Sequence, residues 1–191
     1  MEYTKNKLPD CKIHFFTKLK EYLNTKIYYY GSVQRYDFFD ESDIDIDIFT
    51  INEFSTINQI CNFLNYDKNE VKHFIWKLDI NGQVVQGYKL LYHDQPNNFY
   101  VDISIFNEKY KQNILQDQLS SNNLPFYSIF FLLILKIIYY KIHLIDWATY
   151  SYLKKKIIIT GLGLTDDGEF IIIGEDRVKR IPFGNLFSFF N

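Results

Sequence analysis

Residues 30–49 read YGSVQRYDFFDESDIDIDIF, a Gly-Ser turn followed by alternating aspartates and isoleucines. Successive side chains of a strand point to opposite faces, so Asp43, Asp45 and Asp47 crowd one face while the isoleucines between them are buried on the other. Carboxylates this close repel one another, and a divalent cation such as Mg²⁺ or Mn²⁺, which prefers hard oxygen ligands, relieves the repulsion. The stretch therefore indicates metal-dependent phosphate chemistry.

The composition is that of a globular protein. The chain has 191 residues, of which 47% are hydrophobic and 19% aromatic, enough for one compact domain with a real core. A net charge of -2 and a pI near 6.1 argue against a protein that coats long nucleic acid, but they allow binding of one nucleotide or one strand end. Abundant Ile, Lys, Asn, Tyr and Phe are typical of an AT-rich genome, such as that of a parasite or a large DNA virus.

Several features favour a cytoplasmic protein without a membrane partner. Cys11 and Cys61 have no metal-ligand spacing and suit reduced thiols, and the amino terminus has no secretory signal pattern. The apolar stretch 126–145 contains Lys136 and Lys141, so it is interpreted as a buried core helix rather than a membrane span. Lys136 could reach a bound triphosphate, or it could extend its ammonium to solvent along an apolar surface.

The periodicity of apolar residues predicts the secondary structure. The expected helices cover residues 10–24, 55–64 with Ser55 as N-cap, 125–145 and about 146–158, with a short helix within 32–39. The expected strands cover residues 27–30, 43–49, 73–80, 83–92 and 99–106, followed by a terminal hairpin of 169–173 and 177–181. Asn81-Gly82 is a strong hairpin signal, which makes residues 73–106 a meander.

The spacing around the aspartates adds a more specific signal. Ten residues separate Ser32 from Asp43, and Asp43-Ile44-Asp45 then supplies a D-x-D strand. This arrangement resembles the DNA polymerase beta-like nucleotidyltransferase superfamily, in which a Gly-Ser turn is followed by about ten residues and a D-x-D strand. The resemblance covers the first 106 residues. In that superfamily a third acidic residue lies on a later strand, and Asp102 in the predicted strand 99–106 matches it.

We predict an α+β fold in two parts, of which the resemblance covers only the first. Residues 1–107 would form the nucleotidyltransferase catalytic core, a mixed sheet with flanking helices that carries the carboxylates. Residues 108–191 would form a helical carboxy-terminal region that closes a cleft over them and ends in the short hairpin.

The resemblance also implies the roles of the site residues. Asp43 and Asp45 would hold two Mg²⁺ or Mn²⁺ ions, and Asp102 would hold the ion that activates the acceptor hydroxyl and could receive its proton. Gly31 would let the backbone approach the phosphates of the nucleotide, and Ser32 would offer amide and hydroxyl donors to them.

The function implied is template-independent transfer of a nucleoside monophosphate from a nucleoside triphosphate to a hydroxyl. The acceptor could be an RNA 3' end, a small molecule or a protein side chain. The alternative is a catalytically silent module of the same fold that binds a nucleotide or a partner protein. The basic run 154–156 is open to two interpretations, contact with a nucleic-acid end or a solvated helix face.

Two residues depart from the family pattern, and two other interpretations of the acidic run compete with it. Tyr36 stands where many members have a second glycine, and Asp47, about 13 Å along the strand from Asp43, is expected at a solvated strand end rather than among the ligands. The aspartates alone would also suit an edge strand with a solvated acidic face. A calcium loop is excluded, because Ile48 and Phe54 stand where that motif requires Gly and Glu.

Overall fold

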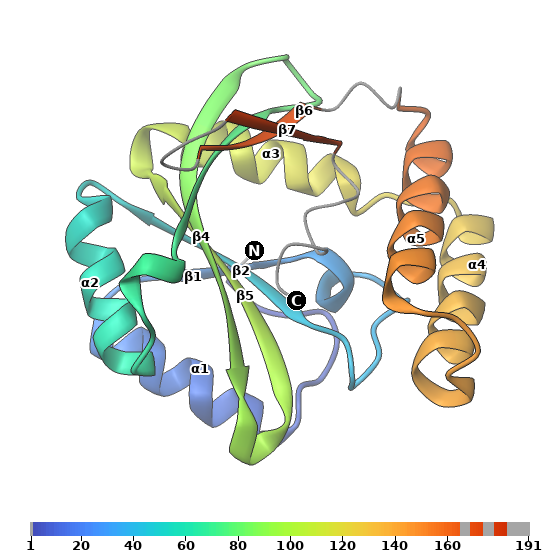
Figure 1. Ribbon diagram of the computed structural model, residues 1–191, viewed down its shortest axis with the longest axis horizontal. Helices are drawn as coiled ribbons and strands as arrows, with labels where there is room; N and C mark the ends of the chain where they lie inside the picture. The colour runs from blue at the N-terminus through green and yellow to red at the C-terminus, as the bar shows by residue number, and fades with distance from the viewer. Residues whose placement is uncertain (1, 165–168, 174–177, 183–191) are drawn as a thin grey trace.

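The computed structural model describes residues 2–164, 169–173 and 178–182, and Figure 1 shows their arrangement. The strands are β1 (Ile27–Tyr30), β2 (Ile44–Thr50), β3 (Lys72–Lys77), β4 (Val84–Asp94), β5 (Phe99–Asn107), β6 (Glu169–Ile173) and β7 (Val178–Pro182). The α-helices are α1 (Asp10–Leu23), α2 (Glu53–Leu64), α3 (Lys111–Ser121), α4 (Phe126–Lys136) and α5 (Trp147–Leu162). Short 3-10 helices are η1 (Gly31–Gln34), η2 (Lys68–Glu70), η3 (Gln95–Asn97) and η4 (Glu108–Tyr110), and η5 (Ile137–Ile142) is a π-helical turn.

The strands form one mixed sheet in the order β1-β2-β5-β4-β3-β6-β7. β2 and β5 pair in parallel, and the other neighbours pair antiparallel. The predicted α+β class, the meander and the terminal hairpin are confirmed, although residue 177 and the turn between the last two strands lie outside the described residues. The edge-strand interpretation of the aspartates is wrong, because β2 lies between β1 and β5 and both of its edges are paired.

The first face of the sheet is covered by α1 and α2 (Figure 1). The isoleucines of β2 are buried there against Ile57 and Ile60 of α2 and Phe16 and Leu19 of α1, as the alternation predicts.

The N-cap of α2 is Asn52 and not Ser55. The Asn52 side chain accepts a hydrogen bond from the Ser55 amide at 3.0 Å, and an amide three residues into a helix is the usual partner of such a cap.

The second face carries the aspartates and is covered in part by α3. Ile114 of α3 packs with Phe49, Phe74 and Phe106 in a separate apolar cluster toward the end of β2. Figure 1 shows α4 and α5 side by side beyond the start of β2. The aspartate row therefore runs between an apolar cluster under α3 and the helical pair α4–α5.

The long apolar helix differs from the expectation of a buried core helix. Only Ser128, Leu132, Leu135 and Lys136 of α4 are buried, and Phe126 is 82% exposed. Among the α-helices, α4 packs substantially against α5 only. One apolar side of α4 is therefore left uncovered in the described structure. Within the described ranges no single helix is long and apolar enough to cross a membrane; residues 108–121 and 126–142 reach that length only as a pair bent by 84°.

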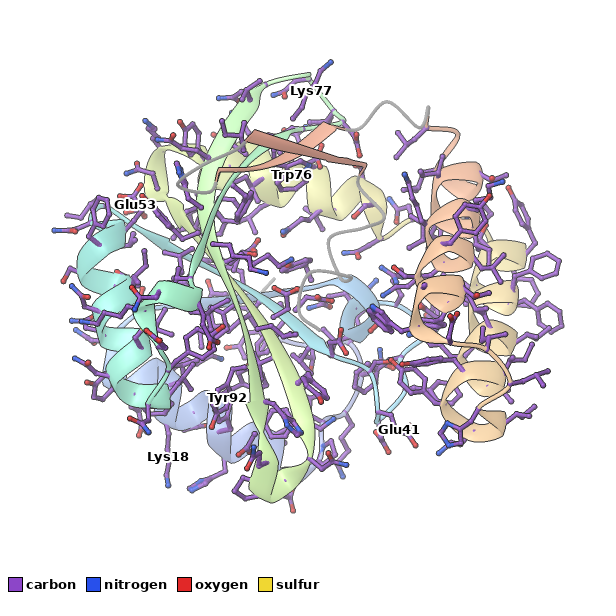
Figure 2. The ribbon with its side chains drawn as sticks, viewed as in Figure 1. Lys18, Glu41, Glu53, Trp76, Lys77 and Tyr92 are labelled. Atoms are coloured by element: carbon purple, nitrogen blue, oxygen red, sulfur yellow. The ribbon has the colours of Figure 1, made fainter. Side chains whose placement is uncertain are left out.

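Two lysines join the helical part to the loop that precedes β2. The Lys136 ammonium donates to the backbone oxygen of Asp37 at 2.5 Å and to Ser42 Oγ at 3.2 Å, and it lies 3.2 Å from the Asp37 carboxylate. Lys136 is 1% exposed, so it does not extend to solvent. Lys141 forms a second ion pair with Glu41, which lies on the side of this loop that faces α4 and α5 (Figure 2).

The ion pair between Lys136 and Asp37 is fully enclosed. Arg35 also donates to Asp37, at 2.8 Å through Nε. Burial alone would raise the pKa of Asp37, but the charges of Arg35 and Lys136 outweigh it and lower the pKa. Burial lowers the pKa of Lys136 to about 8, and Asp37 opposes that change. The loop before β2 is thus fixed by charges from both sides.

We predict that Lys136→Met lowers the free energy of unfolding by about 3 kcal/mol, because it removes one partner of a buried ion pair. Lys141→Met is the matched control, since its ion pair with Glu41 is solvent-exposed and worth no more than about 1 kcal/mol. Urea denaturation of both variants measures the difference. Equal losses of stability would contradict the buried role of Lys136.

Candidate active site

Two of the predicted carboxylates are brought together by strand register. β2 and β5 pair in parallel with Asp45 opposite Asp102, and residues opposite one another in neighbouring strands have side chains on the same face. Asp102 is 0% exposed and Asp45 is half-buried. The structure therefore places the third predicted acid on the same face as the D-x-D strand, as the resemblance implies.

Gly31 lies directly against the carboxylate of Asp45. Its φ of +68° is in the left-handed region, and a Cβ atom built there would lie 2.1 Å from Asp45 Oδ2. No other residue type has both the freedom at this φ and the space, so the Gly-Ser turn and the D-x-D strand require each other. Tyr30, the residue before this glycine, pairs with Asp45 in the antiparallel ladder of β1 and β2.

The other two predicted site residues flank this pair. Ser32 is buried in η1, the 3-10 helix that begins at Gly31, and its backbone oxygen accepts from the Arg35 amide at 2.9 Å. Asp43 precedes β2 by one residue and is half-buried. Its charge contributes to raising the pKa values of both Asp45 and Asp102, so the three carboxylates share one electrostatic environment.

Ionising Asp45 and Asp102 at the same time is unfavourable. Burial raises the pKa of Asp45 to about 7, and the charges of Asp102 and Asp43 add to the rise. Burial also raises the pKa of Asp102, which the charge of Lys89 opposes. A group of acids held against its own repulsion is the arrangement in which a cation gains most by binding.

Lys89 is a functional candidate that the sequence did not single out. It lies on β4 opposite Ser104, and its ammonium forms an ion pair with Asp102 Oδ2 at 2.8 Å. The lysine is 7% exposed. The available signal was a lone lysine between Tyr88 and Leu90 in a predicted apolar strand, but only the register of β4 and β5 reveals its partner.

Asp47 is not at a solvated strand end. It is 0% exposed and its Oδ2 accepts a hydrogen bond from Gln118 of α3 at 2.5 Å. The expectation was wrong because the sequence alone does not show that α3 folds back over the far half of β2. Asp47 is thereby held in the packing of α3, further along β2 than the site pair.

The helical part contributes charge from across the site. Lys154 of α5 lowers the pKa of Asp45 and of Asp102, although burial dominates both. Tyr150, one turn earlier in α5, is buried, and burial with a contribution from Asp43 raises its pKa. Tyr139 of η5 stacks on Tyr150 with ring centroids 4.4 Å apart. The same end of α5 therefore presents an aromatic cluster and a cation toward the aspartates.

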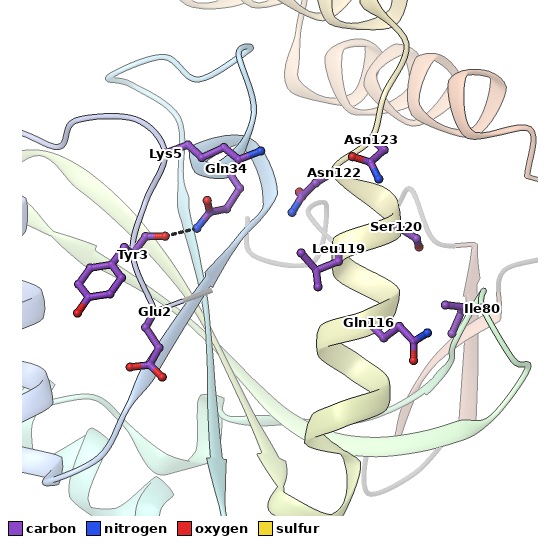
Figure 3. Close-up of a pocket in the computed structure, with 10 residues that line it drawn as sticks. All are labelled: Glu2, Tyr3, Lys5, Gln34, Ile80, Gln116, Leu119, Ser120, Asn122 and Asn123. Carbon is purple, nitrogen blue, oxygen red and sulfur yellow. Dashed lines mark hydrogen bonds between the residues drawn. The ribbon is translucent and has the colours of Figure 1, made fainter.

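A cleft of about 500 Å³ lies beside η1 rather than over the carboxylates. Figure 3 shows it between the amino-terminal segment and α3, with Gln34 donating to the backbone oxygen of Tyr3 at 2.7 Å. Its wall on the α3 side includes Gln116 and Asn123. None of the five predicted site residues lines it, so it is separate from the carboxylate pair.

The donor set fits a hard divalent cation. Asp43 and Asp45 offer carboxylate oxygens, and Asp102 Oδ1 is buried without a hydrogen-bond partner among the described residues. Among the described residues, no three His, Cys, Asp or Glu side chains converge closely enough to hold one ion together. Asp43 and Asp45 thus offer carboxylate oxygens near the start of β2, and Asp102 is engaged by Lys89.

Comparison with known proteins finds likeness in solved structures only. No family model and no curated protein sequence matches the chain. The structure is similar to that of conserved protein GrpB from Enterococcus faecalis, with 15% identity, a TM-score of 0.48 and coverage of 83% of this chain and 96% of that one. It is also similar to a chain of the GLD-2/RNP-8 complex, with 12% identity, a TM-score of 0.42 and coverage of 81% of this chain and 51% of that one. Both likenesses concern the backbone arrangement, and the site is interpreted from its own residues.

We predict that Gly31→Ala destabilises the protein more than Gly163→Ala does. Both glycines have a positive φ, which costs an alanine roughly 1 kcal/mol, but only at Gly31 would the new methyl meet the Asp45 carboxylate. At Gly163 a Cβ meets nothing within 4 Å. Urea denaturation of the two variants measures the extra cost of the contact; equal losses would contradict the close approach of Gly31 to Asp45.

We predict that the metal-free protein loses stability as the pH rises from about 4 to about 7 and that Asp45→Asn reduces this loss. The folded pKa of Asp45, about 7, lies above its ordinary value of 3.8, so the folded protein keeps a proton that the unfolded chain releases. The resulting stabilisation is complete below the ordinary pKa and disappears as the pH rises through the folded pKa. Urea midpoints measured in EDTA across this range test it, and an unchanged pH dependence in the variant would contradict it.

Proposed function

We propose that this chain is a metal-dependent, template-independent nucleotidyltransferase. It would transfer a nucleoside monophosphate from a nucleoside triphosphate to a hydroxyl of an RNA 3' end, a small molecule or a protein. The single observation that carries the proposal is the placement of Asp45 beside Asp102 on neighbouring parallel strands, with Gly31 packed against the Asp45 carboxylate. The motif that ends at Asp45 and the strand that carries Asp102 come from separate parts of the chain and meet at one place.

The reaction assigns a task to each group. The acceptor oxygen attacks the α phosphorus, the bond from that phosphorus to the bridging oxygen of diphosphate breaks, and the hydroxyl proton passes to the carboxylate of Asp102. Mg²⁺ or Mn²⁺ held by Asp43 and Asp45 would offset the charge of the triphosphate and of the departing diphosphate. A carboxylate can take the proton because it is held beside the acceptor in a site with little water.

The turn after β1 supplies the phosphate contacts in this proposal. Gly31 has no side chain to keep a phosphate away from the backbone, and Ser32 follows it with an amide and a hydroxyl. Lys154 of α5 faces the carboxylates with a positive charge that a triphosphate would also attract. The nucleotide would thus lie between η1 and the helical part.

The direct test is label transfer from each α-labelled nucleoside triphosphate with Mg²⁺ or Mn²⁺ and pooled RNA, small-molecule and protein acceptors. We expect transfer by the wild-type chain and a loss of at least about a hundredfold in Asp45→Asn, the order of effect seen when electrostatic stabilisation of a transition state is removed. Asp47→Asn is the matched control on the same strand. It should retain activity, because Asp47 is enclosed against Gln118.

The possible outcomes separate the two functions considered. Equal transfer by wild type and Asp45→Asn would remove the proposed role of the carboxylates. Nucleotide binding without transfer to any acceptor would favour the catalytically silent module. Binding is measured in the same preparations by equilibrium dialysis, so a folded but inactive protein is recognised as such.

A further inference from the structure

Lys89 is buried and held in a regular strand, unlike a mobile lysine on the surface. It belongs to β4, whose ladder with β5 runs from Gly87 opposite Phe106 to Asp94 opposite Phe99, so its backbone is fixed at eight consecutive pairs. Its ammonium lies on the same face as the carboxylates, 2.8 Å from Asp102 Oδ2. Both side chains are excluded from solvent, at 9% and 0% exposure.

An ion pair of this kind persists when further charge enters the site. Moving the ammonium away from Asp102 would leave an uncompensated charge inside the protein, which is strongly unfavourable. A divalent ion bound to Asp102 would also lie next to the ammonium and be repelled by it. The positive charge that Asp102 needs is therefore already present in the chain.

We infer that Lys89 is a built-in counter-ion for Asp102, so that the site takes one divalent cation, at Asp43 and Asp45, in place of two. This inference rests on the proposed function and specifies its metal requirement. It agrees with the absence, among the described residues, of three acidic side chains that converge on one point. It also gives Asp102 a single task, since Oδ2 is engaged by the lysine and Oδ1 has no hydrogen-bond partner in the described structure.

Lys89 is a positioning residue in this scheme and does not touch the reacting atoms. Its charge opposes the rise that burial causes in the pKa of Asp102, and it orients the carboxylate, so that Asp102 accepts the acceptor's proton through Oδ1. The ammonium keeps its own proton throughout the reaction. No bond to Lys89 forms or breaks.

The test is the electron paramagnetic resonance spectrum of Mn²⁺ bound to the full chain, in the presence of a nucleoside triphosphate analogue with a methylene bridge between the α and β phosphorus atoms. Two Mn²⁺ ions about 3.5 to 4 Å apart couple magnetically, whereas a single ion gives an uncoupled spectrum. We expect an uncoupled spectrum for wild type and for Lys89→Arg, which keeps the charge. We expect coupling in Lys89→Met, because Asp102 loses its counter-ion and binds a second ion.

Further variants keep the inference falsifiable if Lys89→Met does not fold. Asp102→Asn should retain the one bound ion, while Asp45→Asn should weaken Mn²⁺ binding at least about tenfold, as loss of a group that supports a metal site does. A coupled wild-type spectrum, or loss of the ion in Asp102→Asn, would overturn the role of Lys89 and leave the proposed function standing. A wild-type chain that binds no Mn²⁺ would refute the proposed function itself.

Discussion

Parallel pairing of β2 with β5 is the constraint on which the rest of the site depends. It sets Asp45 beside Asp102 in a sheet face that water reaches poorly, and the charge of Asp102 disfavours ionisation of Asp45. Such a pair persists only if the surroundings supply positive charge or the chain holds protons. The structure supplies Lys89 at 2.8 Å from one carboxylate and the positive charge of Lys154 on α5. In the proposed function, Asp43 and Asp45 would hold a cation from solution.

The geometry around this pair is maintained from two directions. On one side Gly31 is packed so closely against Asp45 that a side chain at this position would displace the carboxylate. On the other side the loop that leads into β2 is bound to the helical part through the enclosed pair of Lys136 and Asp37. A lysine in the most apolar helix therefore has a structural reason, because it fixes the segment that delivers Asp43 to the site.

The two faces of β2 perform different tasks. Its isoleucines are buried against α1 and α2, and its backbone edges are paired with β1 and β5. Its aspartates fall in different surroundings along the opposite face. Asp45 meets the site, whereas Asp47, two residues on, lies under α3 and binds Gln118. One regular sequence pattern thus yields two unlike environments.

The local elements and the candidate acids can be read from the sequence alone. Strict alternation indicated the buried and polar faces of β2, and Asn81-Gly82 indicated the hairpin. Both are short-range patterns that follow from strand geometry and turn chemistry. Asp102 was identified as a third carboxylate through the resemblance that the spacing from Ser32 to Asp43 carries. The tertiary structure decided what each acid contacts. The burial of Asp47, the partner of Lys136 and the ion pair of Lys89 depend on strand register and helix placement, between residues from 13 to 99 positions apart, and no local pattern records such contacts.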